Sequence, residues 1–341
     1  MTGTISSRRA AIWLAGLSLA CFVYFLPRWS SYNEDARIDM VLSIVDRGVV
    51  NIDPYHLNTG DEDKFKGHFY SNKAPGQSLV GVPVYAAFKL ATSLGPIRSL
   101  VDDMERSSAW HGALNDAACL QPVPGDYCRF VTRPKLDFAM LQYLEAVLTV
   151  AIPSTLMLLL FFWFLGFFSE SLFNRTILTG ALGLGTMVFP YSQLFFSHVP
   201  AAALDLAGFV LVFCVIRGLG GDARVPSWIR TNPALAITLA GLSLGLSIVF
   251  EYPATIVVVL VGLYALLQMP RRLVALLIAG AIPPVLVVMA YNFSAFHNPF
   301  TTGYGCNEVK FKGECQGIAG FTWPPSAAKP ARPSASAMAA R

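Results

Sequence analysis

The sequence contains seven apolar stretches, each close to the length of roughly 20 residues that a helix needs to cross a bilayer. They occupy residues 10–27, 137–168, 176–196, 199–216, 233–250, 253–269 and 273–291. Hydrophobic residues make up 54% of the chain and charged residues only 13%, whereas soluble globular proteins carry roughly 25% charged residues. We therefore predict an all-α, polytopic integral membrane protein.

An eighth apolar stretch, 78–94, is interrupted by a glycine, a proline and a lysine. Basic residues concentrate in the cytoplasmic loops of membrane proteins. With Arg8 and Arg9 in the cytoplasm, the other basic groups of the loops fall on the same side only if 78–94 does not span. These groups are Arg175, Arg217, Arg224, Arg230, Arg271 and Arg272. We expect seven spans and a helix at 78–94 lying in the interface, with an eighth span as the alternative.

This topology places four segments on the outer side of the membrane: 28–136, 195–198, 251–253 and the chain after Asn292. The first is a large extracytoplasmic loop that contains the interfacial helix. Residues 1–326 would form the transmembrane domain. Residues 327–341 are rich in Ala, Pro and Ser without an apolar period, which predicts a disordered tail.

Two pairs of cysteines fall in these outer segments. Cys119 and Cys128 lie in the first, and Cys306 and Cys315, with the same spacing, lie in the last. Disulfides form in oxidising compartments, so local pairing within each pair is the preferred interpretation. Four cysteines allow three connectivities, and four free thiols are the alternative. No metal-type C-x-x-C spacing, Walker loop or nucleic-acid motif is present in the sequence.

The segment 31–76 is the one long, densely charged part of an otherwise apolar chain. It begins with Glu34 and Asp35, followed by Arg37, and it ends at Lys73 before a proline-containing step. A carboxylate can act as general base on an acceptor hydroxyl. Arg and Lys can hold a phosphate and stabilise it as it leaves. The pattern favours a site that handles a sugar or phosphate at the membrane surface, although Glu34 and Arg37 could equally form a helix-surface ion pair.

Other polar residues converge on the same predicted side. His198 and Asp205 are seven residues apart in one span, so a helix places them on one face. Glu251 and Tyr252 follow the end of another span. Each has an ordinary structural explanation, but together they favour a polar pocket, because ionisable groups at membrane depth are usually paired or functional.

Several short motifs resemble those of the GT-C superfamily of polyprenyl-phosphate-sugar glycosyltransferases, which includes protein O-mannosyltransferases and the lipid A aminoarabinose transferase. The motifs are E-D-A-R at 34–37, K-A-P-G at 73–76, F-S-H at 196–198, E-Y-P at 251–253, and Y-N at 291–292 with N-P-F-T-T-G-Y at 298–304. The resemblance covers about the first 325 residues. The last three motifs, at 196–198, 251–253 and 291–304, are similar to segments of bacterial members known only as membrane glycosyltransferases.

The resemblance implies transfer of a sugar from a polyprenyl-phosphate donor to a glycan, lipid or protein acceptor, with inversion. The site would lie on the extracytoplasmic face of a bacterial plasma membrane, with the N-terminus in the cytoplasm. Glu34 or Asp35 would be the base and Arg37 and Lys73 would hold the phosphate. His198, Asp205, Glu251 and Tyr252 would line the pocket.

The chain also departs from the superfamily pattern. Asn72 stands where the aminoarabinose transferase has an acid, so we predict no cofactor and no metal. A divalent metal is the alternative, and no residue of the sequence supports it. Superfamily members usually have more spans, which makes this chain a candidate truncated copy. The alternative functions are therefore an inactive copy or a non-enzymatic membrane protein, such as a lipid-linked sugar transporter or a scaffold.

Overall fold

The computed structural model describes residues 6–25, 31–107 and 135–303, whose regular secondary structure is helical apart from one two-stranded ribbon. Its α-helices are α1 (Ser7–Val23), α2 (Tyr32–Arg47), α3 (Gly76–Ser93), α4 (Gly95–Arg106), α6 (Lys135–Ala146), α7 (Ile152–Phe164), α8 (Leu172–Leu184), α9 (Val188–Tyr191), α10 (His198–Leu219), α11 (Ser227–Thr231), α12 (Pro233–Phe250), α13 (Thr255–Gln268) and α14 (Arg271–Phe296). The strands are β1 (Glu62–Phe65) and β2 (His68–Ser71). Short 3-10 turns are η1 (His56–Asn58), η3 (Leu165–Phe167) and η4 (Tyr252–Ala254), and η2 (Val147–Ala151) is a π-helix.

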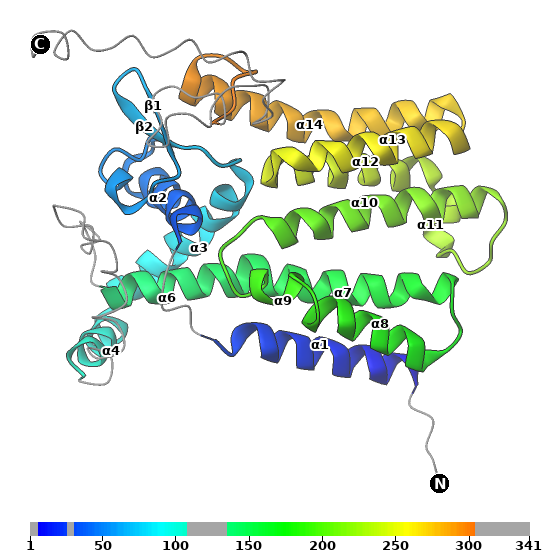
Figure 1. The fold of residues 1–341 in the computed structure, drawn as a ribbon, viewed down its shortest axis with the longest axis horizontal. Helices are drawn as coiled ribbons and strands as arrows, with labels where there is room; N and C mark the ends of the chain where they lie inside the picture. The colour runs from blue at the N-terminus through cyan, green and yellow to red at the C-terminus, as the bar shows by residue number, and fades with distance from the viewer. Residues whose placement is uncertain (1–5, 26–30, 108–134, 304–341) are drawn as a thin grey trace, which may run out of the picture.

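The long helices form a bundle, and α2, the ribbon, α3 and α4 gather at one end of it (Figure 1). We call this end the polar end. The loop between α10 and α11, the turn between α13 and α14 and the start of α1 lie at the opposite end. Buried residues of α10 and α12, such as Val212, Ile237 and Leu244, contribute to the main core of the bundle.

Four helical segments are long and apolar enough to cross a membrane, judged by length and composition over the described residues: Asp137–Phe167, His198–Leu219, Pro233–Phe250 and Arg271–Phe296. They coincide with four of the seven predicted spans. The other three predicted spans correspond to shorter helices, namely α1, α8 and the apolar segment Tyr252–Gln268. The integral membrane prediction is therefore supported, whereas the count of seven is not confirmed.

A helix is present at the predicted 78–94, and it ends at Ser93, close to the predicted end. It is α3, and after Leu94 the chain turns by 93° into α4, so that the two helices together have the composition of a broken span or a re-entrant loop. Gly95 and Pro96 begin α4 and explain the break, because proline cannot donate the hydrogen bond that a continuous helix needs. Counting this pair raises the number of candidate spans to five.

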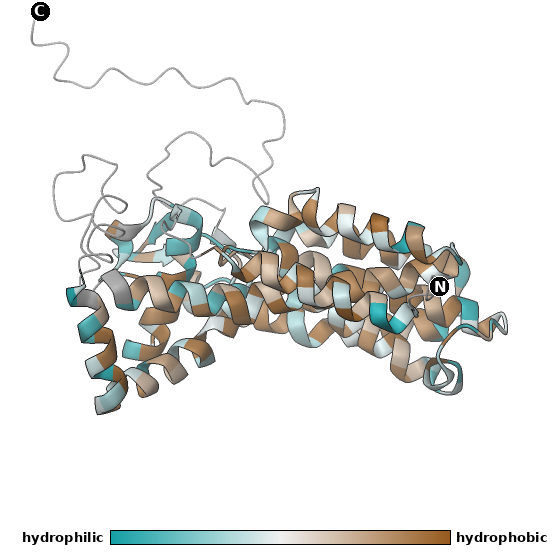
Figure 2. Cartoon of the chain, turned by 90° about the horizontal axis from the view of Figure 1, so that it is seen from below, coloured by the Kyte–Doolittle hydropathy of each residue, from teal (hydrophilic) through white to brown (hydrophobic). Residues whose placement is uncertain are grey.

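The outer surface of the bundle is apolar. Large side chains such as Trp13 on α1, Leu263 and Leu267 on α13, and Ile278 and Ile282 on α14 are exposed. Figure 2 shows hydrophobic residues along the bundle and hydrophilic residues collected toward its ends. Water would penalise this much exposed apolar surface, whereas hydrocarbon would not, which fits a bilayer environment.

Helices α12 and α14 touch through their backbones. A Cβ at Gly241 would lie 1.9 Å from the carbonyl oxygen of Leu277, and one at Gly280 would lie 2.1 Å from that of Thr238. Only glycine permits such an approach, as is common where membrane helices cross closely.

Local sequence explains how α2 and the ribbon form at the polar end. Ser31 and Glu34 make a capping box at the start of α2, and Gly48 ends the helix in the left-handed conformation with φ of 70°. The ribbon turns at Lys66 and Gly67, both with positive φ, as two-residue hairpin turns require. The fold therefore presents the charged segment as a compact unit of helix and hairpin.

Candidate functional site

Arg37 is the centre of a buried polar cluster at the polar end. Its side chain is 1% exposed, and its Nη2 lies 3.2 Å from Oε1 of Glu251, which follows α12. The same Nη2 donates to Oγ of Ser197, whose hydroxyl donates to Glu251. Nη1 donates to the carbonyl oxygen of Asn33 at 2.8 Å and also to its side-chain oxygen. Residues 214 positions apart in sequence thus form one ion pair.

His198 is the exposed member of this cluster. It is the first residue of α10, and its Nδ1 lies 3.0 Å from Oε1 of Glu251. Its side chain is 41% exposed, against 13% for that of Glu251. Burial alone would raise the pKa of Glu251, but the His198 hydrogen bond and the charge of Arg37 hold it below its ordinary value.

Glu34 is held by hydrogen bonds within the fold. Its Oε2 accepts from the backbone N–H and hydroxyl of Ser31, at 3.0 and 3.2 Å. Its Oε1 accepts from Nε2 of Gln142 on α6 and from the N–H of Phe195, at 3.1 and 3.2 Å. Burial raises the pKa of this carboxyl in spite of these bonds. Oε2 therefore caps α2 itself, whereas Oε1 ties the start of α2 to α6 and to the segment before α10.

Lys73 forms an ion pair with Asp61 and is not part of the Arg37 cluster. The two charged atoms lie 2.8 Å apart, and the Lys73 side chain is 12% exposed. The hairpin produces this pair, because the N–H of Asn72 bonds to the carbonyl oxygen of Asp61 directly beyond the end of the ribbon. The sequence predicted Lys73 as a phosphate ligand and gave no signal for this partner.

The step at 73–76 nevertheless lies against the Glu251 turn. A Cβ at Gly76 would lie 2.7 Å from the carbonyl oxygen of Val249. Ala74 and Tyr252 share one buried cluster, and Tyr252 donates to Oδ1 of Asn292 at 3.4 Å. The motif regions around 34–37, 73–76, 196–198 and 251–253, and the end of α14, therefore meet at the polar end.

The segment after α14 also reaches this step. A Cβ at Gly303 would lie 2.6 Å from Cα of Asn72. Asn292 on α14 donates to the carbonyl oxygen of Pro299 at 3.3 Å, which holds the segment near the end of its helix. The segment 298–303 is thus fixed against the entry to α3.

Besides Glu34, Lys73 and Tyr252, whose partners are given above, Asp205 and Asp35 also lie outside the Arg37 cluster. Asp205 lies two helical turns along α10 and neighbours Ser247 of α12, and it makes no recorded contact with His198 among the described residues. Asp35 is buried on α2, in the turn that also carries Glu34. The cluster instead includes Ser197 and Asn33, which the sequence did not single out as functional residues.

Sequence reasoning also missed other buried carboxyls, among them Asp63 and Glu145. Asp63 on β1 is 1% exposed, and burial together with the neighbouring charge of Glu62 raises its pKa to about 7. Glu145 on α6 is fully buried beside Gly81, and its carboxylate makes no hydrogen bond to the described residues. A single acid in a span or strand carries no sequence pattern that reveals such burial.

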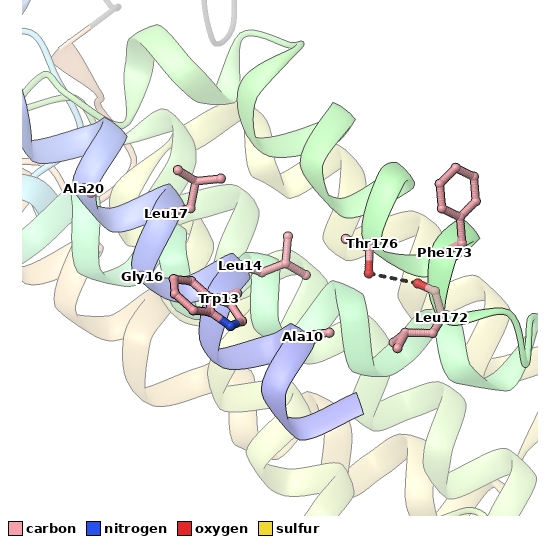
Figure 3. Close-up of a pocket in the computed structure, with 9 residues that line it drawn as sticks. All are labelled: Ala10, Trp13, Leu14, Gly16, Leu17, Ala20, Leu172, Phe173 and Thr176. Atoms are coloured by element: carbon pink, nitrogen blue, oxygen red, sulfur yellow. Dashed lines mark hydrogen bonds between the residues drawn. The ribbon is translucent and has the colours of Figure 1, made fainter. Parts of the chain in front are cut away.

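A separate apolar groove of about 860 Å³ lies between α1 and α8. Trp13 and Leu17 line one side of it and Phe173 the other (Figure 3). Thr176, the hydroxyl-bearing side chain at its edge, donates to the carbonyl oxygen of Leu172 at 2.8 Å. This groove has the chemistry of a lipid-facing surface and lies apart from the polar cluster.

Among the described residues, no group of three or more His, Cys, Asp or Glu side chains could hold a metal ion. The prediction of no cofactor thus stays a prediction. Cys119, Cys128, Cys306 and Cys315 lie outside the described residues, as does the tail at 327–341.

Comparison with known proteins identifies no relative: no protein-family model, curated protein or solved structure matches this chain.

Proposed function

We propose that this chain is a membrane glycosyltransferase that moves a sugar from a polyprenyl-phosphate donor to an acceptor, with inversion. The observation that carries the proposal is the meeting, at one end of the bundle, of the charged start of α2, the step at 73–76, the turn at 197–198 and the turn at 251–252. A site of this kind needs acids and bases together at a membrane surface, where a lipid-linked donor can reach it.

The proposed topology keeps seven spans, with α1, α8 together with α9, and α13 crossing alongside the four longer segments. Their exposed apolar side chains, including Trp13, Phe173 and Leu267, support this. Basic residues at the opposite end, such as Arg217 and Arg224, favour a cytoplasmic location for that end. The polar end would then face outward from a bacterial plasma membrane, with the N-terminus inside.

Asp35 is our candidate for the base. Glu34 uses both carboxylate oxygens in four hydrogen bonds, so its neighbour is the better candidate for proton transfer. In the proposed step, the acceptor oxygen attacks the anomeric carbon while its proton passes to Asp35. The bond from that carbon to the phosphate oxygen breaks, and its electron pair leaves with the polyprenyl phosphate. Direct displacement gives inversion.

Lys73 would hold the donor phosphate, and the turn at Glu251 and Tyr252 would form a wall of the pocket, with His198 beside it. Asp205 would lie below them in the bundle. Proximity of Ala74 to Tyr252 supports the placement of Lys73 near that wall. The acceptor is a glycan, lipid or protein.

The test measures transfer of labelled sugar from a polyprenyl-phosphate donor by purified protein in lipid vesicles. Asp35→Asn should reduce kcat by about 100-fold or more, the range expected for loss of a general base. Glu34→Gln should reduce it less and lower thermal stability more, because it disturbs the α2 cap. Undiminished transfer by Asp35→Asn would reject Asp35 as base. Absence of transfer by the wild-type chain with every donor would argue for a transporter or an inactive copy.

A further inference from the structure

His198 is the place where the buried Arg37 cluster reaches the exposed surface of the polar end. We propose that His198 is a second cationic contact for the donor phosphate, beside Lys73, and that Arg37 acts through Glu251 to position it. This inference rests on the proposed polyprenyl-phosphate donor and adds a residue and a role to that site.

Arg37 is poorly placed to bind the phosphate itself. Its guanidinium is 1% exposed and already donates to Asn33, Ser197 and Glu251. To reach a lipid phosphate it would have to give up its ion pair with the buried carboxylate of Glu251, which is unfavourable for a buried charge. Any phosphate contact that the cluster adds to Lys73 therefore has to come from another of its members.

The geometry of His198 suits this role. Glu251 holds Nδ1 at 3.0 Å, which fixes that nitrogen as a donor to the carboxylate. Nε2 makes no hydrogen bond to the described residues, and the side chain is exposed. The rings of Tyr191 and Phe196 pack edge-on against the imidazole at centroid distances of 5.0 and 5.5 Å. The ring orientation is thus set on one side by a carboxylate and on the others by aromatic side chains.

The charges point to an anion as the ligand. One carboxylate, Glu251, is shared between Arg37 and His198, so the cluster carries one net positive charge when the imidazole is protonated. The donor's phosphodiester carries one negative charge, which matches. When the sugar leaves, the phosphate becomes a monoester with more negative charge, and a charged N–H donor stabilises it further.

Binding measurements test this without requiring turnover. Purified protein in nanodiscs is titrated with farnesyl phosphate, farnesol and inorganic phosphate. We expect the wild type to bind farnesyl phosphate at least tenfold more tightly than farnesol, and His198→Gln to lose about tenfold or more in farnesyl phosphate affinity, the loss expected for one charge-assisted hydrogen bond. His198→Lys should retain most of the affinity, because it keeps a cation there.

His68 provides a matched control. Its Nδ1 lies 2.7 Å from Oδ2 of Asp53, so it has the same imidazole–carboxylate pairing on the ribbon, outside the Arg37 cluster. His68→Gln should leave farnesyl phosphate binding unchanged. Equal affinity of His198→Gln and wild type, with a folded variant by thermal unfolding, would overturn the inference. Equal binding of farnesol and farnesyl phosphate by the wild type would also overturn it, as would binding that inorganic phosphate alone reproduces at the same affinity.

Kinetics separate this inference from the proposed function. With an active wild type, His198→Gln should raise KM for the donor more than it lowers kcat. A fall in kcat with unchanged KM would assign His198 to proton transfer and reject phosphate binding. If no sugar is transferred by any variant but His198 still determines farnesyl phosphate affinity, the glycosyltransferase proposal fails while the phosphate contact stands.

Discussion

The two ends of the bundle both carry arginine–carboxylate pairs, but they hold them differently. At the polar end, Arg37 and Glu251 are 1% and 13% exposed. At the opposite end, Arg217 and Arg224 both pair with Asp222 while their own side chains are about half exposed. Exposed ion pairs require little desolvation and contribute little to the stability of the fold. A buried pair rarely adds stability over apolar residues, so its presence is a reason to look for function.

The largest expected difference between the ends is in the effect of removing one arginine. Arg37→Met leaves Glu251 buried without its cation and should destabilise the protein by about 3–5 kcal/mol. Arg224→Met at the opposite end should change stability little, because its side chain is about half exposed and its pair is solvated. Thermal unfolding in detergent measures both. The double variant Arg37→Met with Glu251→Leu should recover much of the loss, and similar small effects at both ends would remove the distinction.

The second prediction concerns pH and Asp63. Because its folded-state pKa is raised to about 7, above the unfolded value of 3.8, the folded protein holds a proton that the unfolded chain releases. Stability should therefore fall as pH rises from about 4 to 7 and change little from this group above that, by an amount on the order of a few kcal/mol. Asp63→Asn should flatten this slope in thermal melts across pH. Asp103→Asn, at an exposed position on α4, is the control.

A third prediction concerns the cap of α2. Glu34→Ala removes the acceptor for four hydrogen bonds and leaves the N–H of Phe195 and the amide of Gln142 without it, so we expect a loss of about 2–3 kcal/mol. Glu34→Gln should lose less, since one amide oxygen still accepts. If thermal melts showed no loss for Glu34→Ala, the carboxylate would not be the link between α2 and α6.

The smallest expected effect is at the end of α2. Gly48→Ala places a side chain in the left-handed region at φ of 70°, where no neighbouring atom lies within 4 Å of the new Cβ. The cost should be about 1 kcal/mol from backbone strain alone. Gly95→Ala, which has similar space and ordinary φ, should be close to neutral. A much larger loss of stability for Gly48→Ala would contradict the open space around this position.

The sequence could predict which segments share an end of the bundle. Alternation of spans and the distribution of arginines placed the turns at 195–198 and 251–253 beside the charged segment, and the contacts of Arg37 with Ser197 and Glu251 bring them together there. The partners themselves could not be predicted. The pair of Arg37 with Glu251 depends on how α2 and α12 cross, and no local pattern encodes that crossing.

Helix lengths were also beyond the sequence. The apolar stretch at 176–196 is continuous in composition, but α8 ends at Leu184 and a separate short helix, α9, follows. Gly185 follows α8 at a position where a Cβ would lie 2.9 Å from the carbonyl oxygen of Ala181. Similarly, the ribbon that pairs Lys73 with Asp61 depends on a two-residue turn whose effect appears only when both strands are in register.

The glycine contacts of α12 determine which parts of the polar end can move. Backbone touches backbone between Gly241 and Leu277, and again where Gly76 meets Val249. Helix α12 is therefore packed closely against α14 and the start of α3, and Glu251 directly follows this helix. Arg37 and His198 contact Glu251 through their side chains, so we expect a ligand at the cluster to shift these side chains while the carboxylate keeps its place.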